Sequence, residues 1–137
     1  MTKKELMQKC ELIARQNKVK LTWVDDGVYG YYIPNTNKIA VTSIGTKRQI
    51  ISVFCHEMGH VMNFRNKKYY KYHRHIGKKY TRKFKTKHAA VVYALKAEIY
   101  TDTVGKRLCK NWFPDIKFVR NYKMNNKFYN YMYENFI

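Results

Sequence analysis

The sequence lacks the features of exported and membrane-embedded proteins. It has no apolar run near the roughly 18 residues that a membrane-spanning helix needs. Its polar start, Met1–Glu5, has no signal-peptide core. Only three cysteines occur, and the odd number and wide spacing of Cys10, Cys55 and Cys109 exclude a disulfide framework and a cysteine-based zinc motif. We therefore expect reduced core thiols in a cytoplasmic protein with no membrane partner.

Acidic residues are also scarce. The chain has 9 Asp and Glu against 28 Lys and Arg, a formal net charge of +19, and no acidic residue lies between Glu57 and Glu98. A field of this sign favours anionic partners, of which nucleic acid is the commonest. Lysine is more frequent than arginine, however, and it discriminates less among phosphate groups. The charge alone therefore does not define the partner.

The chain has no internal repeat and no flexible linker. Its 137 residues, 45% of them hydrophobic, are enough for one domain with a modest core. Thr2 with Glu5, and Thr46 with Gln49, form capping boxes that each predict the start of a helix. In chain order we expect a helix over 2–18, strands over 19–23, 28–33 and 38–43, helices starting at 46 and 86, and a final helix over 128–136. This order predicts an α+β fold with a small antiparallel sheet.

The strongest chemical signal is the motif His56-Glu57-Met58-Gly59-His60. Residues four apart lie on one face of a helix, so the two histidines can present imidazole nitrogens to one metal ion. Glu57 lies one step further round and can reach a water molecule on that metal. Two imidazoles and one carboxylate leave a fourth position of zinc open for water. The motif therefore predicts one Zn²⁺ per chain. The alternative is a helix with two hydrogen-bonded histidines and a surface glutamate.

Two carboxylates on the next predicted helix can complete this site. Glu98 and Asp102 are four residues apart, so they share a face, and they interrupt an apolar run. A carboxylate buried there needs a partner, because burying it alone is costly. We expect Glu98 to be the third metal ligand and Asp102 to accept a hydrogen bond from a ligating histidine. The alternative is a pair of surface carboxylates that form ion pairs with lysines.

With these motifs the sequence resembles the gluzincin class of zinc metallopeptidases. It is similar to their smallest members, the ImmA/IrrE-type and related phage-encoded peptidase-like proteins. The resemblance spans roughly residues 28–115 and rests on the His-Glu-x-x-His motif and on Glu98-Ile-Tyr-Thr-Asp102. It implies a zincin-like domain over 1–137 that hydrolyses peptide bonds in the cytoplasm of a bacterial cell or phage-infected host. His56, His60 and Glu98 would bind zinc, and Glu57 would be the general base.

The resemblance also implies how such a peptidase would act. The bound zinc would lower the pKa of its water towards ~7, and Glu57 would take the proton as the water attacks a peptide carbonyl. The predicted strand over 38–43 could pair with the substrate as an added strand. The basic residues of the chain, rather than the resemblance, suggest that the substrate is a nucleic-acid-associated or acidic protein.

A basic and aromatic insertion at about 65–87 separates the two metal-binding helices. Basic side chains interleaved with tyrosines suit a nucleic-acid surface, because ammonium groups contact phosphates and rings stack on bases. The candidate contacts are Lys67, Lys68, Lys71, Arg74, Lys78, Lys79, Arg82 and Lys83. A solvated segment whose tyrosines pack inward is the alternative.

Other functions fit parts of the sequence. His73 and His75 follow the motif, so the chain also resembles SprT/Spartan-type proteases of DNA-bound proteins, with His75 as the third ligand. This alternative leaves Glu98 and Asp102 without a role. The zinc could also be structural, in a non-catalytic nucleic-acid-binding or host-interaction module. A third possibility is hydrolysis of a non-peptide amide, such as a cell-wall link.

Overall fold

The computed structural model describes residues 1–25, 30–33, 37–66, 86–120 and 126–135. Its elements, in chain order, are α1 (Lys3–Gln16), β1 (Lys20–Val24), β2 (Gly30–Ile33), β3 (Lys38–Thr42), α2 (Lys47–Arg65), α4 (Lys87–Trp112) and α5 (Asn126–Asn135). This is a small α+β arrangement, as the sequence predicts. The basic and aromatic insertion, apart from its two ends, lies outside the described residues.

The helix starts agree with the sequence. Both predicted capping boxes are present: Thr2 and Glu5 cap α1, and Thr46 and Gln49 cap α2, each with reciprocal hydrogen bonds between side chain and backbone. These bonds satisfy backbone N–H groups that have no partner within the helix. α4 begins at Thr86, whose side chain accepts from the backbone N–H of Ala89. The positions of α1, α2 and α4 along the chain are therefore set by local chemistry.

The prediction of an antiparallel sheet is wrong for one of the two strand pairs. Its strand order is β1-β3-β2, and β3 pairs parallel with β1 and antiparallel with β2. The physical reason lies in burial, because Ile39, Ala40, Val41 and Thr42 of β3 are all buried, whereas no residue of β1 is. A strand that is apolar on both faces is stabilised most at the centre of a sheet. The predicted substrate strand over 38–43 is wrong for the same reason, since both edges of β3 are already paired.

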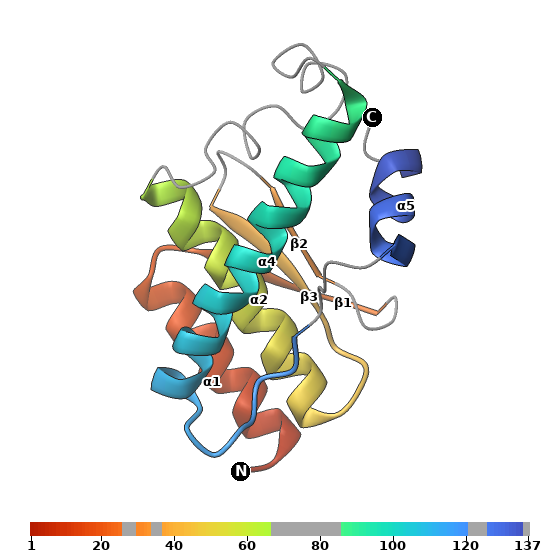
Figure 1. Ribbon diagram of the computed structural model, residues 1–137. Coiled ribbons are helices and arrows are strands. Elements are labelled where there is room, and N and C mark those ends of the chain that lie inside the picture. Colours follow the sequence, from red (N-terminus) through yellow and green to blue (C-terminus); the bar gives the residue numbers. More distant parts are fainter. Residues whose placement is uncertain (26–29, 34–36, 67–85, 121–125, 136–137) are drawn as a thin grey trace.

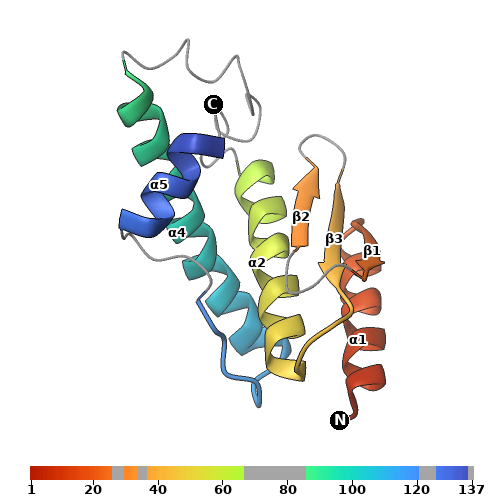
Figure 2. The same ribbon diagram turned by 90° about the vertical axis from the view of Figure 1, so that its right-hand side faces the viewer.

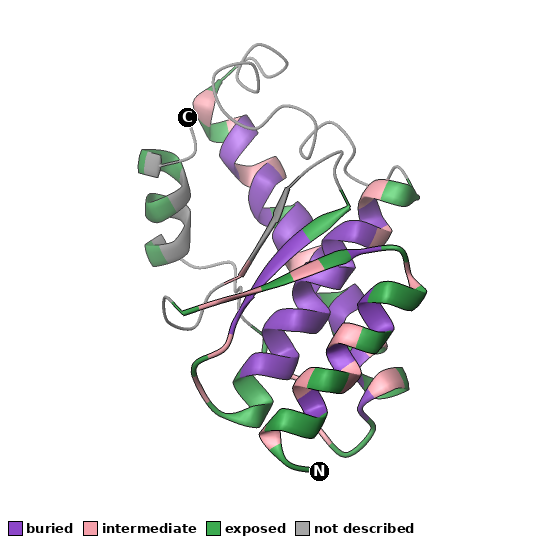
Figure 3. Ribbon diagram, turned by 180° about the vertical axis from the view of Figure 1, so that it is seen from behind, coloured by how far each residue is buried: buried purple, intermediate pink, exposed green. Residues whose placement is uncertain are grey.

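α2 lies at the centre of the molecule. The sheet packs on one side of it and α4 on the other, and α1 contacts both α2 and β1 (Figure 2). Its residues are buried almost without interruption from Ile50 to Val61, as the purple segment of Figure 3 shows. The apolar core joins α1, β3 and α2 to the end of α4. The His-Glu-x-x-His motif is therefore enclosed from several sides.

Cys10, Cys55 and Cys109 are buried and free of disulfides, in agreement with their prediction as core thiols. α5 packs on α4, and the ammonium group of Lys87 lies 4.2 Å from the ring centroid of Tyr133. Among the described residues, no helix has the length and apolarity needed to cross a bilayer.

Candidate metal centre

The site lies where α2 faces α4. His56, Glu57 and His60 project from α2, and Glu98 and Asp102 project from α4. All five residues are buried, with at most 7% of their surface exposed. The surface alternative for the two α4 carboxylates is therefore wrong, and none of the ion pairs among the described residues involves a lysine or arginine.

His56 is held on both sides of its ring. Its Nδ1 lies 2.7 Å from Oδ1 of Asp102, and its Nε2 lies 3.0 Å from Oε2 of Glu98. Asp102 is one helical turn beyond Glu98, so the two carboxylates bracket one imidazole. A carboxylate that accepts a proton from Nδ1 fixes the ring orientation and leaves Nε2 as the ligand atom.

Glu98 also faces the second histidine. Its Oε2 lies 3.3 Å from Nε2 of His60, and the rings of His56 and His60 meet edge to face with centroids 4.8 Å apart. One carboxylate oxygen is thus shared by two imidazole nitrogens. The ligand atoms of a tetrahedral zinc, with bonds of about 2.0–2.1 Å, are roughly 3.3 Å apart. The spacing of Glu98 from both rings fits that requirement.

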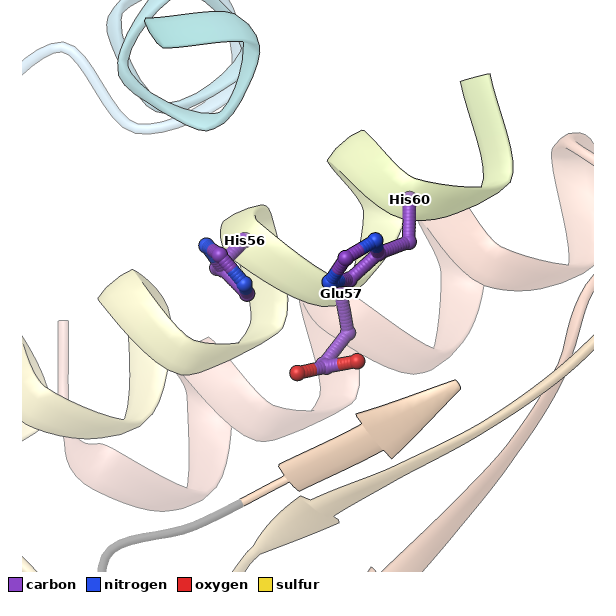
Figure 4. A group of neighbouring side chains, drawn as sticks. All are labelled: His56, Glu57 and His60. Atoms are coloured by element: carbon purple, nitrogen blue, oxygen red, sulfur yellow. The ribbon is translucent and has the colours of Figure 1, made fainter. Parts of the chain in front are cut away.

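Glu57 has a different environment. It forms a buried group with His56 and His60 in which one ligand atom of each residue lies within 4.8 Å of the others, and this group could hold a metal ion. Figure 4 shows the Glu57 side chain extending from α2 toward the sheet. Its Oε2 is buried and has no hydrogen-bond partner among the described residues. A buried carboxylate oxygen without a partner is costly, so this atom marks a place where a further group is expected.

The electrostatics differ between the two glutamates. Burial acts to raise the pKa of Glu98, but the facing imidazoles of His60 and His56 outweigh it and hold that pKa well below its usual range. Burial likewise raises the pKa of Glu57, and there the imidazoles only partly offset the effect. Glu98 is therefore a fixed anion, whereas Glu57 lies closer to accepting a proton.

His56 completes this balance of charge. Burial acts to lower its pKa, but hydrogen bonds with Asp102 and Glu98 dominate and raise it to about 10. Without a metal, the two carboxylates favour the protonated form of the ring. The same buried negative charge would stabilise a divalent cation at the point where Nε2 meets Glu98, because a metal competes with protons for its ligands.

Two glycines let the helices approach closely enough for these contacts. A Cβ on Gly59 would lie 2.9 Å from the carbonyl oxygen of Thr101, and one on Gly105 would lie 3.1 Å from that of Cys55. The cost of glycine inside a helix, about 1 kcal/mol relative to alanine, predicts for Gly59 the close approach of another backbone. The structure confirms that prediction.

A third glycine positions the sheet against the motif. A Cβ on Gly30 would lie 2.6 Å from the carbonyl oxygen of Ala40, 2.7 Å from Cγ1 of Val53 and 3.0 Å from Cγ of Glu57. The absent side chain of Gly30 thus leaves the space that Glu57 occupies. Nothing in the sequence indicates this contact, because it depends on how β2 docks on α2.

A polar contact beside the site was also missed. The amide Nδ2 of Asn63 donates to Oγ1 of Thr101 at 2.9 Å, and Thr101 donates in turn to the carbonyl of Ala97 at 2.8 Å. Each of the two side chains lies three residues beyond a candidate ligand, His60 on α2 and Glu98 on α4. A polar residue at helical spacing from a ligand was a signal that could have found them.

The structure brings together the five residues that the sequence assigned to the metal site. The candidate nucleic-acid contacts of the insertion lie outside the described residues, as do His73 and His75. The Spartan-like alternative therefore stays a prediction. No match was found when the chain was compared with protein-family models, with curated proteins and with solved structures.

Proposed function

We propose that the protein is a zinc-dependent metallopeptidase with a gluzincin-type site in a zincin-like domain. One observation carries this proposal: the two glutamates near the histidines differ in the contacts of their carboxylate oxygens. Oε2 of Glu98 faces Nε2 of both His56 and His60, while Oε2 of Glu57 is buried and has no partner among the described residues. This is the arrangement that a site with a ligand and a separate general base requires.

His56, His60 and Glu98 would hold the metal through Nε2, Nε2 and Oε2. Two imidazoles and a carboxylate form a donor set typical of catalytic zinc. When bound, zinc would lower the pKa of a water molecule and polarise the substrate carbonyl. Nδ1–H of His56 would donate a hydrogen bond to Oδ1 of Asp102, 2.7 Å away, which keeps the other ring nitrogen directed at the site.

Glu57 supplies the proton transfers. Its unpartnered Oε2 takes a proton from the attacking water, and burial has already raised the pKa of this carboxyl group. The same oxygen then gives the proton to the leaving amine, which restores the carboxylate. Glu98 is unsuited to this role, because the imidazoles hold its pKa well below the usual range.

β2 offers a binding edge for an extended substrate. It is the outer strand next to β3 and lies against α2 at Gly30, beside Glu57. A peptide that adds to this edge through main-chain hydrogen bonds would pass in front of the general base. This strand replaces the one over 38–43, whose edges are both paired.

The metal content of the purified protein tests the first part of the proposal. We expect about one zinc ion per chain, lost in Glu98→Ala and kept in His75→Ala. The reverse result for these two variants would support the Spartan-like ligand set. Cleavage of a quenched fluorescent peptide library tests the second part. Zinc-loaded wild type that cleaves no faster than Glu57→Gln would contradict the proposed peptidase.

A further inference from the structure

A cluster of cations lies at the end of the α2–α4 pair where α2 begins and α4 ends. The start of α1, the start of α2 and the end of α4 are at this end of the molecule in both Figure 1 and Figure 2. We call it the basic end and define it by seven residues: Lys3, Lys4, Lys9, Lys47, Arg48, Lys110 and Lys117.

Direct contacts hold these elements together. The ammonium group of Lys9 donates to the carbonyl of Trp112 and lies 4.9 Å from the ring centroid of Phe113. Nε of Arg48 donates to the carbonyl of Lys117 at 2.8 Å. A cavity of about 320 Å³ is lined by Met1, residues of α1, the first residue of α2 and the segment 113–116. The start of α1, the start of α2 and the segment after α4 therefore adjoin one another at the basic end.

The positive charge of the basic end exceeds its negative charge. Among the described residues, the acidic side chains near these cations are Glu5, which is engaged in the capping box of α1, Asp115, and Glu11, which lines a cavity with Lys3 and Lys4. None of the lysines and arginines in the described residues forms an ion pair with a carboxylate. Three of the chain's nine acidic residues, Glu57, Glu98 and Asp102, are buried in the metal centre. Burying them there leaves the surface more cationic than the net charge implies.

The surroundings favour phosphate over lipid. Insertion at a membrane surface is driven by a wide apolar helix face. Most apolar side chains of α1 and α2 are buried in the core, and the exposed ones near the starts of these helices, Met1 and Ile44, are single residues. The N-termini of two helices point out at the basic end, which adds partial positive charge beside the lysines. Spaced cations on the ends of rigid helices match the repeated charges of a nucleic-acid backbone.

We propose that the basic end binds the phosphate backbone of nucleic acid through residues other than those of the insertion and of the metal centre. Binding here needs neither zinc nor Glu57. It would place the middle of α2, and with it the metal centre, beside protein already bound to the same nucleic acid.

Two triple variants with equal net charge test this proposal. Lys4→Gln/Lys47→Gln/Lys110→Gln removes three exposed cations from the basic end. Lys20→Gln/Lys38→Gln/Lys96→Gln removes three exposed cations elsewhere. Both keep the whole insertion. Binding of a short fluorescein-labelled DNA duplex is measured by anisotropy across a salt series, with thermal unfolding as the check that each variant folds.

For the basic-end triple, we expect the slope of log affinity against log salt to become less steep by about 2 to 3, since each phosphate contact contributes roughly 0.9. The control triple should change the slope by less than about one contact. Equal effects in both triples, or none in the basic-end triple, would overturn the proposal. It would also be overturned if that triple lost binding only to phosphatidylserine vesicles. Glu57→Gln should bind DNA like wild type. The DNA-binding test therefore stays informative even if the protein proves not to be a peptidase.

Discussion

The two sides of α2 at the motif differ in how far their polar groups are satisfied. On the side toward α4, both ring nitrogens of His56 face a carboxylate oxygen, at 2.7 and 3.0 Å. On the side toward the sheet, Oε2 of Glu57 is buried without a partner among the described residues. α2 therefore holds His56, a proposed ligand, between two carboxylates and leaves Oε2 of Glu57, the proposed base, without a hydrogen bond among the described residues. A site that must hold a metal and also move a proton needs both conditions.

The packing of the two sides reinforces this difference. Toward α4, Gly59 and Gly105 bring the backbones together, and the bond from Asn63 to Thr101 crosses the interface. Toward the sheet, Gly30 also allows a close approach, and the side chain of Glu57 occupies the space beside it. Both sides are therefore closely packed, but polar side chains pair across the interface with α4, whereas Oε2 of Glu57 has no hydrogen-bond partner among the described residues. Substitutions on each side should have distinct effects.

The largest effect is expected on the sheet side. Glu57→Gln keeps the shape of the side chain but removes the proton acceptor, so peptide cleavage should fall by about 10²–10⁴-fold. Zinc content should stay that of wild type, because Glu57 is not a ligand in this account. Steady-state cleavage of a fluorescent peptide and elemental analysis of the same preparation check both halves. Loss of zinc with activity would make Glu57 a ligand.

A smaller effect, on zinc affinity, is expected from substitution of Asp102, which contacts the proposed ligand His56. Asp102→Asn disturbs the hydrogen bond that orients His56, and it should weaken zinc binding by about 10–100-fold. Competition with a chromophoric chelator measures the affinity. Asp115→Asn is the control, because it makes the same chemical change on an exposed carboxylate. Equal affinities for the two variants would show that Asp102 does not position the ligand.

The glycine contact between the helices should affect stability. In Gly59→Ala the new methyl group would meet the carbonyl of Thr101 at 2.9 Å, and overpacking of this kind costs about 1–3 kcal/mol. The better helix propensity of alanine offsets up to about 1 kcal/mol of that cost. Urea unfolding should therefore show a net loss. A gain in stability would mean that α2 and α4 are further apart than described.

The smallest effect is expected from the polar contact beside the site. Asn63→Ala removes the donor to Thr101, and a buried hydrogen bond of this kind contributes about 1 kcal/mol. Thr101 keeps its own bond to the carbonyl of Ala97, which limits the cost. Thr101→Ser preserves both bonds and serves as the matched variant in the same urea titration. If Thr101→Ser lowers the free energy of unfolding as much as Asn63→Ala does, the loss of stability comes from packing and not from the hydrogen bond.

Local chemistry made much of this structure predictable from the sequence. Capping residues mark where α1 and α2 begin, and helical geometry sets the spacing of His56 and His60 along α2 and of Glu98 and Asp102 along α4. The order of the strands was not predictable in the same way. Consecutive short strands suggested an antiparallel meander, whereas β3 lies at the centre because it is buried on both faces. The contact of Gly30 with Glu57 depends on that docking and was missed for the same reason.

Glu98 is the proposed ligand and Glu57 the proposed base, and zinc titration of two matched variants distinguishes these roles. Glu57→Gln and Glu98→Gln make the same chemical change at two buried glutamates about one site. We predict that Glu57→Gln binds one zinc with the affinity of wild type, and that Glu98→Gln binds it at least about 100-fold more weakly. Retained binding in Glu98→Gln together with lost binding in Glu57→Gln would contradict the account.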